Sequence, residues 1–396
     1  MNGGSAETVS IHTSPTKASS GTQTDDYDTN TDVGDDSSRH AATTITTTAP
    51  PPPSPPPVNK HIQYKYLPPS SKATEEDDKK FVETIGACRT LECITKAHAT
   101  LPRTPAVYNF PHFMIIGFQK AATTSLFKHL QEHPALRRSL PKEPDFFTYE
   151  CHDAPPEGCD DGKKVFRYLN NTLESHKYLQ FGGKFGHFEG STHYIRGGPA
   201  VAWGLRRTFP WLKLIIQLRE PISRAMSMLV HNRDVTHVGC LMRKPMHFCL
   251  LNNSQLTVRQ PPYTYEDALA PWFEAFPADK IHVIQYEALT EEESMKRELR
   301  RVKKFLEIDP DQPPGAGLGL YNSRRFNITP DGWKFPKSQY QKLIDLVRPD
   351  MERVLTSLER HDKVKNRTDW VARWEEVWNG NLDACDESGW CTIVLS

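Results

Sequence analysis

Short apolar runs alternate with amphipathic helical patterns from about residue 105 onward. Residues that can start a helix or a crossing loop follow each run, and this alternation is typical of α/β folds with a largely parallel sheet. We therefore predict a single α/β domain over residues 105–396, with a central parallel β-sheet flanked by helices. The runs expected to form its strands are Phe113 to Phe118, Phe185 to Glu189, Leu212 to Leu218 and Ile281 to Tyr286.

Two amphipathic helices and a tryptophan-rich tail are expected in the second half of this domain. One helix carries an apolar stripe between Met295 and Leu306, and another runs from about Lys337 to Leu358. Pro349 should kink the second helix or divide it in two, because proline removes a helical hydrogen bond. The tail should pack as a covering helix, and its tryptophans are Trp370, Trp374, Trp378 and Trp390.

The first sixty residues differ in composition from the rest. Residues 1–57 consist largely of Ser, Thr, Asp and Gly and end in a proline-rich run that begins at Pro50. Such a segment buries too little apolar area to offset its ordering entropy. We predict a disordered Ser/Thr/Pro-rich tail or stem over residues 1–60, either an O-glycosylated stalk or a plain tail. A connecting segment would follow over residues 61–104.

The eight cysteines fall into four sequence-local couples. None has the Cys-x-x-Cys spacing of a zinc or thioredoxin-like site, so short disulfide loops are favoured, with scattered free thiols as the alternative. Disulfides would place the protein in an oxidising compartment. The expected pairs are Cys88 with Cys93, Cys151 with Cys159, Cys240 with Cys249, and Cys385 with Cys391.

The sequence features that bear on the cellular compartment disagree with one another. The N-x-[ST] sequons fit a secretory location. No apolar stretch near the N-terminus, however, is long enough for a signal peptide or a membrane anchor. Two alternatives follow: a type II membrane protein of the Golgi lumen whose anchor is not present in this chain, or a soluble cytoplasmic enzyme. The sequons are at Asn170, Asn252, Asn327 and Asn366.

The segment from Phe113 to Leu126 indicates a buried strand that runs through a loop into a helix. The N–H groups and positive dipole end of such a helix suit a phosphate, while Thr and Ser add hydroxyls and Lys120 adds charge. The alternative is an ordinary strand, turn and helix with Thr123 as its N-cap. The nucleotide triphosphatase pattern Gly-x-x-x-x-Gly-Lys-[Ser/Thr] is absent, because Lys120 precedes the Thr-Thr pair without that glycine.

A second candidate phosphate site is Arg219-Glu-Pro-Ile-Ser-Arg-Ala-Met-Ser227, which follows a predicted strand. Arg219 would form a forked charged pair, and Ser227, two turns into the next helix, would donate a hydroxyl. Taken alone, Arg219 could instead form a surface ion pair, and Ser227 could occupy a helix face. The strand ends in Gln217-Leu-Arg219, where magnesium chemistry would place an aspartate, so we expect no metal.

The two motifs, in this order and about a hundred residues apart, resemble a known family. Lys120-Ala-Ala-Thr-Thr-Ser-Leu is similar to the 5′-phosphosulfate-binding loop of sulfotransferases that use 3′-phosphoadenylyl sulfate (PAPS). Arg219 to Ser227 is similar to their 3′-phosphate-binding motif. The resemblance spans roughly residues 105–378 and is strongest for the Golgi carbohydrate branch, the heparan and chondroitin sulfotransferases. It implies a P-loop-like fold.

Three further segments share this resemblance. Lys142-Glu143-Pro-Asp-Phe146-Phe147 resembles the segment that carries the catalytic glutamate of heparan sulfotransferases. Glu189-Gly-Ser-Thr-His-Tyr194 is similar to the family's Glu-Lys-[Ser/Thr]-Pro-x-Tyr strand, and Asn322-Ser-Arg324-Arg325 to the loop that closes over the 3′-phosphate.

Two residues depart from the family pattern. Ala122 stands where glycine is usual, and at a positive φ alanine would cost about 1 kcal/mol. Gly190 stands where many heparan enzymes have lysine, so one catalytic cation is either missing or supplied by Lys142.

The resemblance implies transfer of a sulfuryl group from PAPS to a hydroxyl, or an amine, of a carbohydrate or glycosaminoglycan-like acceptor, without a metal. Lys120 would neutralise the leaving oxygen, and Glu143 would take the acceptor proton. His187 and His193 are rival bases, although each is expected to be structural, and His112 should only shape the entry to the first strand. The expected donor-binding residues are Lys120, Ala121, Ala122, Thr123, Thr124, Ser125, Arg219, Ser227, Arg324 and Arg325.

Two other functions compete with this one. The first is a cytosolic sulfotransferase for a small alcohol or phenol. The second is a catalytically silent nucleotide- or glycan-binding relative, although binding alone would not need Glu143. The 49 basic and 49 acidic residues balance, which neither favours nor excludes a polyanionic partner, and no nucleic acid is expected. Acceptor identity would depend on variable loops such as residues 150–180 and 232–265.

Overall fold

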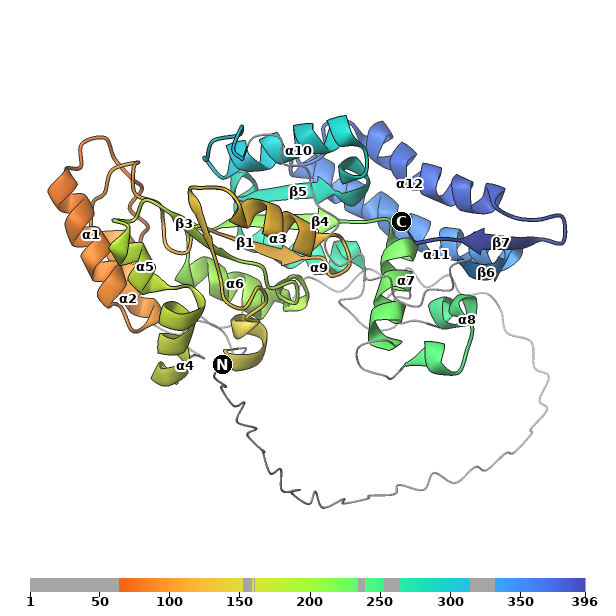
Figure 1. The fold of residues 1–396 in the computed structure, drawn as a ribbon, viewed down its shortest axis with the longest axis horizontal. Coiled ribbons are helices and arrows are strands. Elements are labelled where there is room, and N and C mark those ends of the chain that lie inside the picture. Colours follow the sequence, from red (N-terminus) through yellow and green to blue (C-terminus); the bar gives the residue numbers. More distant parts are fainter. Residues whose placement is uncertain are drawn as a thin grey trace, which may run out of the picture. The chain divides into compact units, whose positions relative to one another are not determined.

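The central parallel β-sheet predicted for this chain is present, and helices flank both of its faces (Figure 1). Arg324, Arg325, Asn327 and the tail or stem predicted over residues 1–60 lie outside the described residues. The computed structural model describes residues 64–151, 159, 161–233, 239–252, 264–313 and 332–395.

The sheet has five strands in the order β2-β3-β1-β4-β5, and every neighbouring pair is parallel. The four predicted runs form β1, β3, β4 and β5, each one residue shorter than expected. Strand β2 was not predicted, because it has three residues of which only the first is buried. The strands are β1 Phe113–Gly117, β2 Leu136–Arg138, β3 Gly186–Glu189, β4 Lys213–Leu218 and β5 Ile281–Gln285.

Alternate side chains of β1 enter two apolar clusters, one on each face of the sheet, as the pleat of a strand requires. Phe113 and Ile115 pack in a cluster with side chains of α3 and α10. Met114 and Ile116 belong to a larger cluster with side chains of α6, α9 and α11. These helices are α3 Thr123–Gln131, α6 Gly198–Thr208, α9 Tyr265–Ala275, α10 Glu292–Phe305 and α11 Lys337–Arg360.

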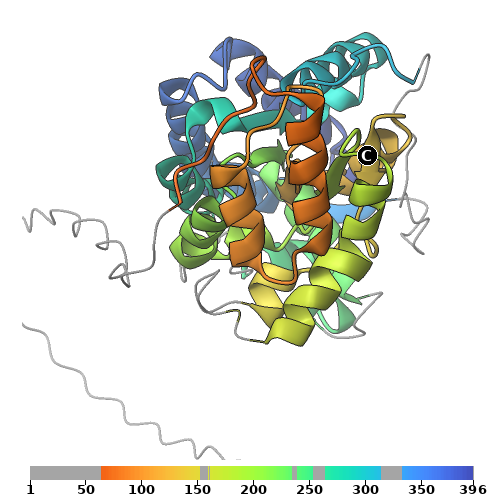
Figure 2. The ribbon, with the colours of Figure 1, turned by 90° about the vertical axis from the view of Figure 1, so that its left-hand side faces the viewer.

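Residues 64–104, most of the segment predicted to be a connection, contain helices α1 Glu75–Ala87 and α2 Leu91–Thr100. Apolar side chains of both helices are buried in the larger cluster. The pair lies beside α4 Gly162–Arg167 and α5 Ser175–Gln180 (Figure 2). Helices α1 and α2 thus share the core of the domain that follows them. The domain boundary near residue 105 stays a prediction.

The C-terminal elements correct two expectations. Helix α11 continues through Pro349, so the proline does not divide it, and the alternative of a kink stays a prediction. Trp374 and Trp378 are buried on α12 Arg367–Asp383, which agrees with a covering helix. Trp390, however, is on β7 Trp390–Ile393, which pairs antiparallel with β6 Trp333–Pro336, because the chain turns back after α12.

The four predicted disulfides are present, and each closes a short loop. Cys88–Cys93 joins the end of α1 to α2, and Cys385–Cys391 joins the end of α12 to β7. Cys240–Cys249 fixes a 3-10 turn, Cys240–Met242, to α8 Met246–Leu251. Among the described residues, none of the helices is both long and apolar enough to cross a membrane.

Candidate active site

The predicted site residues follow strands whose carboxyl ends share one edge of the sheet. The chain leaves β1 toward β2, returns to β3 and then crosses to β4 on the other side of β1, so the loops after these strands meet beside β1. In open α/β sheets such a switch in strand order is where ligands bind. The fold therefore brings the motif after β1, the segment after β2 and the motif after β4 to one edge.

The loop after β1 leads directly into the N-terminus of α3. The residue before this helix is Ala122, with φ of 62°, and no side chain among the described residues caps the helix there. Thr123 is the first helical residue rather than the N-cap, so the ordinary capped turn that we considered is wrong. The positive φ also confirms the strain foreseen at Ala122, worth about 1 kcal/mol relative to glycine. The first-turn N–H groups suit an anion.

Arg219 connects the two phosphate motifs. It follows β4 directly, is 6% exposed, and donates a hydrogen bond from Nη1 to the backbone carbonyl of Lys120 at 3.1 Å. Its own carbonyl accepts a bond from the Tyr265 hydroxyl at 2.6 Å, and its guanidinium lies over the Tyr286 ring. A cation is therefore fixed beside the start of α3, and it is not the surface ion pair of the alternative interpretation. Ser227 is half-buried on α7 Pro221–His231.

Helix α7 is held by a carboxylate that sequence reasoning missed. Glu220 is fully buried and accepts bonds from the backbone N–H groups of Ile222 and Ser223, both at 2.7 Å. The Trp378 indole N–H, from α12, donates to the same carboxylate at 2.7 Å. A glutamate just before a helix start is the available signal, but the sequence does not show its distant partner.

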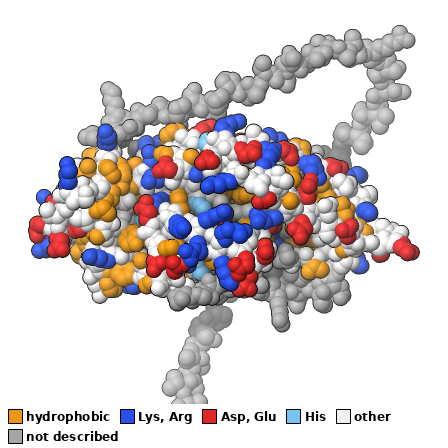
Figure 3. All heavy atoms as spheres, turned by 90° about the horizontal axis from the view of Figure 1, so that it is seen from above, with side chains coloured by type: hydrophobic (Ala, Val, Ile, Leu, Met, Phe, Trp, Pro, Cys, Tyr) orange, Lys and Arg blue, Asp and Glu red, His pale blue; other side chains and the backbone are white. Residues whose placement is uncertain are grey.

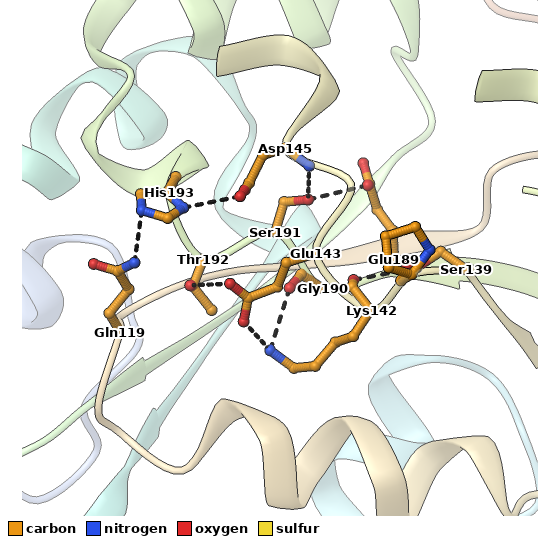
Figure 4. A network of polar contacts seen from close by, with 11 residues as sticks. Gln119, Ser139, Lys142, Glu143, Asp145, Glu189, Gly190, Ser191, Thr192 and His193 are labelled. Atoms are coloured by element: carbon orange, nitrogen blue, oxygen red, sulfur yellow. Dashed lines mark hydrogen bonds and ion pairs between the residues drawn. The ribbon is translucent and has the colours of Figure 1, made fainter. Parts of the chain in front are cut away.

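The loop after β2 presents Glu143, the predicted base, at the edge of the sheet. Its Oε2 accepts a hydrogen bond from the Thr192 hydroxyl at 3.2 Å, and its Oε1 contacts the Lys142 ammonium (Figure 4). The Glu143 side chain is 33% exposed, so it remains accessible to a substrate. Phe146 and Phe147 are buried directly after it and anchor the loop, as the sequence indicated.

Phe127 occupies the space that a side chain at Gly190 would need, and Lys142 lies beside it. A Cβ built on Gly190 would lie 2.8 Å from Cδ2 of Phe127 and 3.7 Å from Cγ of Lys142. The Lys142 ammonium lies 3.5 Å from the Gly190 carbonyl oxygen. A lysine at position 190 would therefore require the Phe127 ring to shift, and Lys142 instead brings a cation to Glu143.

The histidines named from the sequence have different environments. His187 is buried, its Nδ1 bonds with the Leu173 carbonyl, and burial lowers its pKa to about 4, as expected of a structural residue. His112 is likewise buried and bonds with the Leu306 carbonyl. His193 lies in the network around Glu143: its Nδ1 is 3.0 Å from Asp145 Oδ2, and its Nε2 is 2.7 Å from Gln119 Nε2.

Asp145 and Glu189 complete this network and were not predicted as site residues. The backbone N–H of Asp145 donates to the Ser191 hydroxyl at 3.0 Å, and that hydroxyl donates to Glu189 at 3.2 Å. Glu189 also accepts from the Tyr168 hydroxyl, and burial raises its pKa to about 8. The buried carboxyl group of Glu189 thus supports the loop after β3 through its hydrogen bond from Ser191.

Three side chains in this network could in principle ligate a cation. Glu143, Asp145 and His193 each offer one atom, and these atoms lie within 4.8 Å of one another. The oxygens of Glu143 bond with Thr192 and contact the Lys142 ammonium, a neighbour that opposes a second positive charge. The expectation that no metal is needed stays a prediction.

The fold thus brings the start of α3, the buried cation of Arg219 and the hydrogen-bonded carboxylate of Glu143 to one edge of a parallel α/β sheet. Residues 203–316 match the model of the sulfotransferase domain family, a range that includes Arg219 and Ser227. Over these residues the chain is similar to the sulfotransferase domain family, so the family resemblance drawn from its motifs is confirmed.

Similar curated proteins carry sulfotransferase names. Carbohydrate sulfotransferase 15 of Mus musculus is 23% identical over 249 residues, which is 50% of this chain and 44% of that protein. A bifunctional heparan sulfate N-deacetylase/N-sulfotransferase of Drosophila melanogaster is 26% identical over 216 residues, which is 51% of this chain and 20% of that protein. The chain thus spans less than half the length of these relatives.

Solved structures of sulfotransferases are also similar to this chain. A sulfotransferase from Alicyclobacillus acidocaldarius has a TM-score of 0.44 at 21% sequence identity and covers 63% of this chain and 96% of its own. The sulfotransferase domain from the curacin biosynthetic pathway has a TM-score of 0.32 at 16% identity and covers 50% of this chain and 74% of its own.

Proposed function

We propose that this protein transfers a sulfuryl group from PAPS to a hydroxyl, or an amine, of a carbohydrate acceptor. The observation that carries the proposal is the hydrogen bond of 3.1 Å between Arg219 and the Lys120 carbonyl. It joins the two phosphate motifs at the sheet edge that also presents Glu143. The names of the relatives, carbohydrate and heparan sulfate sulfotransferases, favour this acceptor class over a small phenol or alcohol.

The donor would bind between the loops after β1 and β4. The residues present fit its charges: the start of α3 lacks a side-chain cap among the described residues, and Arg219 is fixed beside it. Thr123 and Thr124 would hold the 5′-phosphate, while Arg219 and Ser227 would hold the 3′-phosphate that distinguishes PAPS from ATP. Ala121, Ala122 and Ser125 complete the proposed loop, with Arg324 and Arg325 contributed from outside the described residues.

PAPS supplies an activated sulfuryl group, and the residues of this chain would position it and manage charge and protons. Lys120 would stabilise the negative charge that develops on the leaving phosphate oxygen. Glu143 would accept the acceptor's proton as the new S–O or S–N bond forms and the bond between sulfur and the 5′-phosphate oxygen breaks, which releases adenosine 3′,5′-bisphosphate. Thr192 and Lys142 hold Glu143 through its two oxygens, so its orientation is set before the acceptor arrives.

A carbohydrate or glycosaminoglycan-like acceptor is compatible with the charge distribution. The net charge is zero, yet Lys and Arg side chains gather near the middle of one face, with Asp and Glu side chains around them (Figure 3). A zero net charge therefore coexists with local basic surface. We propose no nucleic-acid partner.

The proposed location is the Golgi lumen, with membrane attachment through an N-terminal anchor. The four disulfides support an oxidising compartment. The exposed sequon residues Asn252 and Asn366 would be accessible to glycosylation there. Mass mapping of protein from its natural source under non-reducing conditions tests this location. Four intact disulfides are expected, whereas eight free thiols would support the cytoplasmic alternative.

A transfer assay with radiolabelled PAPS tests the function directly. The acceptor panel comprises glycosaminoglycans, simple glycans and small alcohols, and label is expected in a carbohydrate. Calorimetry with adenosine 3′,5′-bisphosphate and with AMP, without added metal, tests donor binding separately. Tight bisphosphate binding without transfer to any acceptor would indicate a catalytically silent relative, and equal affinity for both nucleotides would contradict the donor site.

A further inference from the structure

The loop after β3 touches both neighbouring loops because β3 lies between β2 and β1 in the sheet. On the β2 side, Ser191 accepts from the Asp145 backbone and Thr192 donates to Glu143. On the β1 side, His193 reaches Gln119, which directly precedes Lys120 in the chain. The loop that carries the proposed base and the loop that carries the proposed cation are therefore connected through residues 191–193.

His193 is the residue that reaches both sides at once. Its Nδ1 is 3.0 Å from Asp145 Oδ2 and its Nε2 is 2.7 Å from Gln119 Nε2, and Figure 4 shows the imidazole between these two side chains. One atom of His193 lies within 4.8 Å of one carboxylate oxygen each of Glu143 and Asp145. The His193 and Asp145 side chains are 32% and 14% exposed, so the bridge is partly shielded from water.

We propose that His193 is a positioning residue for sulfuryl transfer, which sets the separation between Glu143 and Lys120 by bridging Asp145 and Gln119. The inference rests on the proposed function of this site. The base and the cation must act on opposite sides of the sulfur, so their spacing determines whether both engage one substrate. A misplacement of about 1 Å can cost about a hundredfold in rate.

The contacts of its ring assign His193 this role rather than that of the base. In the neutral tautomer that donates its Nδ1–H to Asp145, Nε2 accepts from the Gln119 amide, so both ring nitrogens are engaged. Protonation would turn Nε2 into a donor and would require the Gln119 amide to present its oxygen instead. The bridge should therefore respond to pH.

The titratable and charged groups that face the imidazole come from three elements. Asp145 and Glu143 lie on the loop after β2, Tyr149 lies at the end of η1 Phe146–Glu150 with its ring 5.6 Å away, and Arg196 follows on the turn of His193 itself. The Asp145 hydrogen bond is the largest contribution and raises the pKa of His193. Asp145→Asn should lower that pKa and shift the acid limb of the rate profile to lower pH.

The test compares Gln119→Leu, His193→Ala and their double variant in the transfer assay. Each single change should lower kcat by about 10- to 100-fold while the KM for PAPS changes by less than about threefold. The double variant should be no slower than the worse single variant, because both changes break one bridge. His176→Ala is the matched control, since His176 is exposed on α5, and it should leave kcat unchanged.

Hydrogen–deuterium exchange of the full chain provides a readout that does not need activity. Gln119→Leu leaves His193 and Asp145 in place, and it should raise exchange at the amides of residues 119–122 and 143–147 together. If wild-type protein transfers no sulfuryl group, the proposed function fails, and a joint rise in exchange still supports the bridge.

Three results would overturn the proposal. Losses in kcat that multiply in the double variant would show two independent roles. Restoration of His193→Ala activity by free imidazole would show that His193 is itself the base. Unchanged exchange in one of the two segments of Gln119→Leu would show that the loops are not coupled.

Discussion

The two halves of the candidate site are held in place by different kinds of structure. The donor side, residues 118–122 and 219–220 after β1 and β4, consists of a main-chain turn, a helix start and the buried Arg219. The base side comprises residues 139–145 and 190–193 after β2 and β3. Its polar side chains bond to one another, and those of Glu143 and His193 are about one-third exposed. The donor side is fixed by the fold itself, whereas the base side depends on a side-chain network.

The largest expected effect is on turnover, and substitution of Glu143 should separate the base side from the donor side. Glu143→Gln keeps the shape of the side chain but removes the base, so turnover should fall by about 10²- to 10⁴-fold. Bisphosphate affinity should stay nearly unchanged, because the change lies on the base side. Steady-state kinetics and calorimetry of the same protein measure both quantities. Lys120→Ala is the matched comparison, since it should lower donor affinity and turnover together. Retention of most wild-type turnover by Glu143→Gln would exclude Glu143 as the base.

The next effect concerns the donor side. Arg219→Ala removes a buried cation that bonds to the Lys120 carbonyl, so bisphosphate binding should weaken by about 2–4 kcal/mol. AMP binding should change less, because AMP lacks the 3′-phosphate. Calorimetry with both nucleotides measures the difference. Equal losses for the two nucleotides would show that Arg219 supports the loop rather than the 3′-phosphate.

A smaller effect uses pH to probe the base side through Glu189. Its folded-state pKa is raised to about 8, above the ordinary value of 4.5, because it is buried. The folded state therefore keeps a proton on Glu189 that the unfolded state releases, so the contribution of Glu189 to the free energy of unfolding should fall as pH rises between these values. This contribution changes by at most about 1.4 kcal/mol per pH unit.

Denaturant unfolding of the wild-type protein and of Glu189→Gln at several pH values measures this contribution as the difference between their two slopes, because the buried His187, whose pKa is lowered, contributes with the opposite sign in both proteins. Burial raises the pKa of Glu287 to about 7, so Glu287 contributes with the same sign, and part of the slope should survive in the variant. A slope that Glu189→Gln leaves intact would show that Glu189 is ionised in the folded protein.

The smallest effect tests the strain on the donor side. Ala122 has a φ of 62°, a conformation that glycine adopts more readily. Ala122→Gly should therefore stabilise the protein by up to about 1 kcal/mol, less the extra entropy that glycine has in the unfolded chain. Thermal unfolding measures the change, and Ala121→Gly is the neighbouring control because Ala121 is not among the residues with positive φ. A loss of stability in Ala122→Gly would mean that the methyl group makes a compensating contact.

This difference between main-chain structure and a side-chain network also explains which site residues could be predicted from the sequence. Lys120 and Arg219 stand next to apolar strands, so a local pattern of strand, loop and helix locates them. Asp145, Thr192 and His193 meet across segments almost fifty residues apart in the chain, and no periodicity connects them. Strand β2 was missed for a related reason, since three residues with one buried side chain give no apolar run.

The support of Glu220 by the last long helix means that intact motifs do not guarantee a competent enzyme. Trp378 on α12 donates to Glu220, and Trp374 donates to Glu287, which in turn accepts from the Glu220 backbone. A premature stop codon after residue 360 would spare every proposed catalytic and donor-binding residue and still remove both indoles. Splice forms or alleles of this kind should be scored as loss of function, even though a motif search would classify them as active.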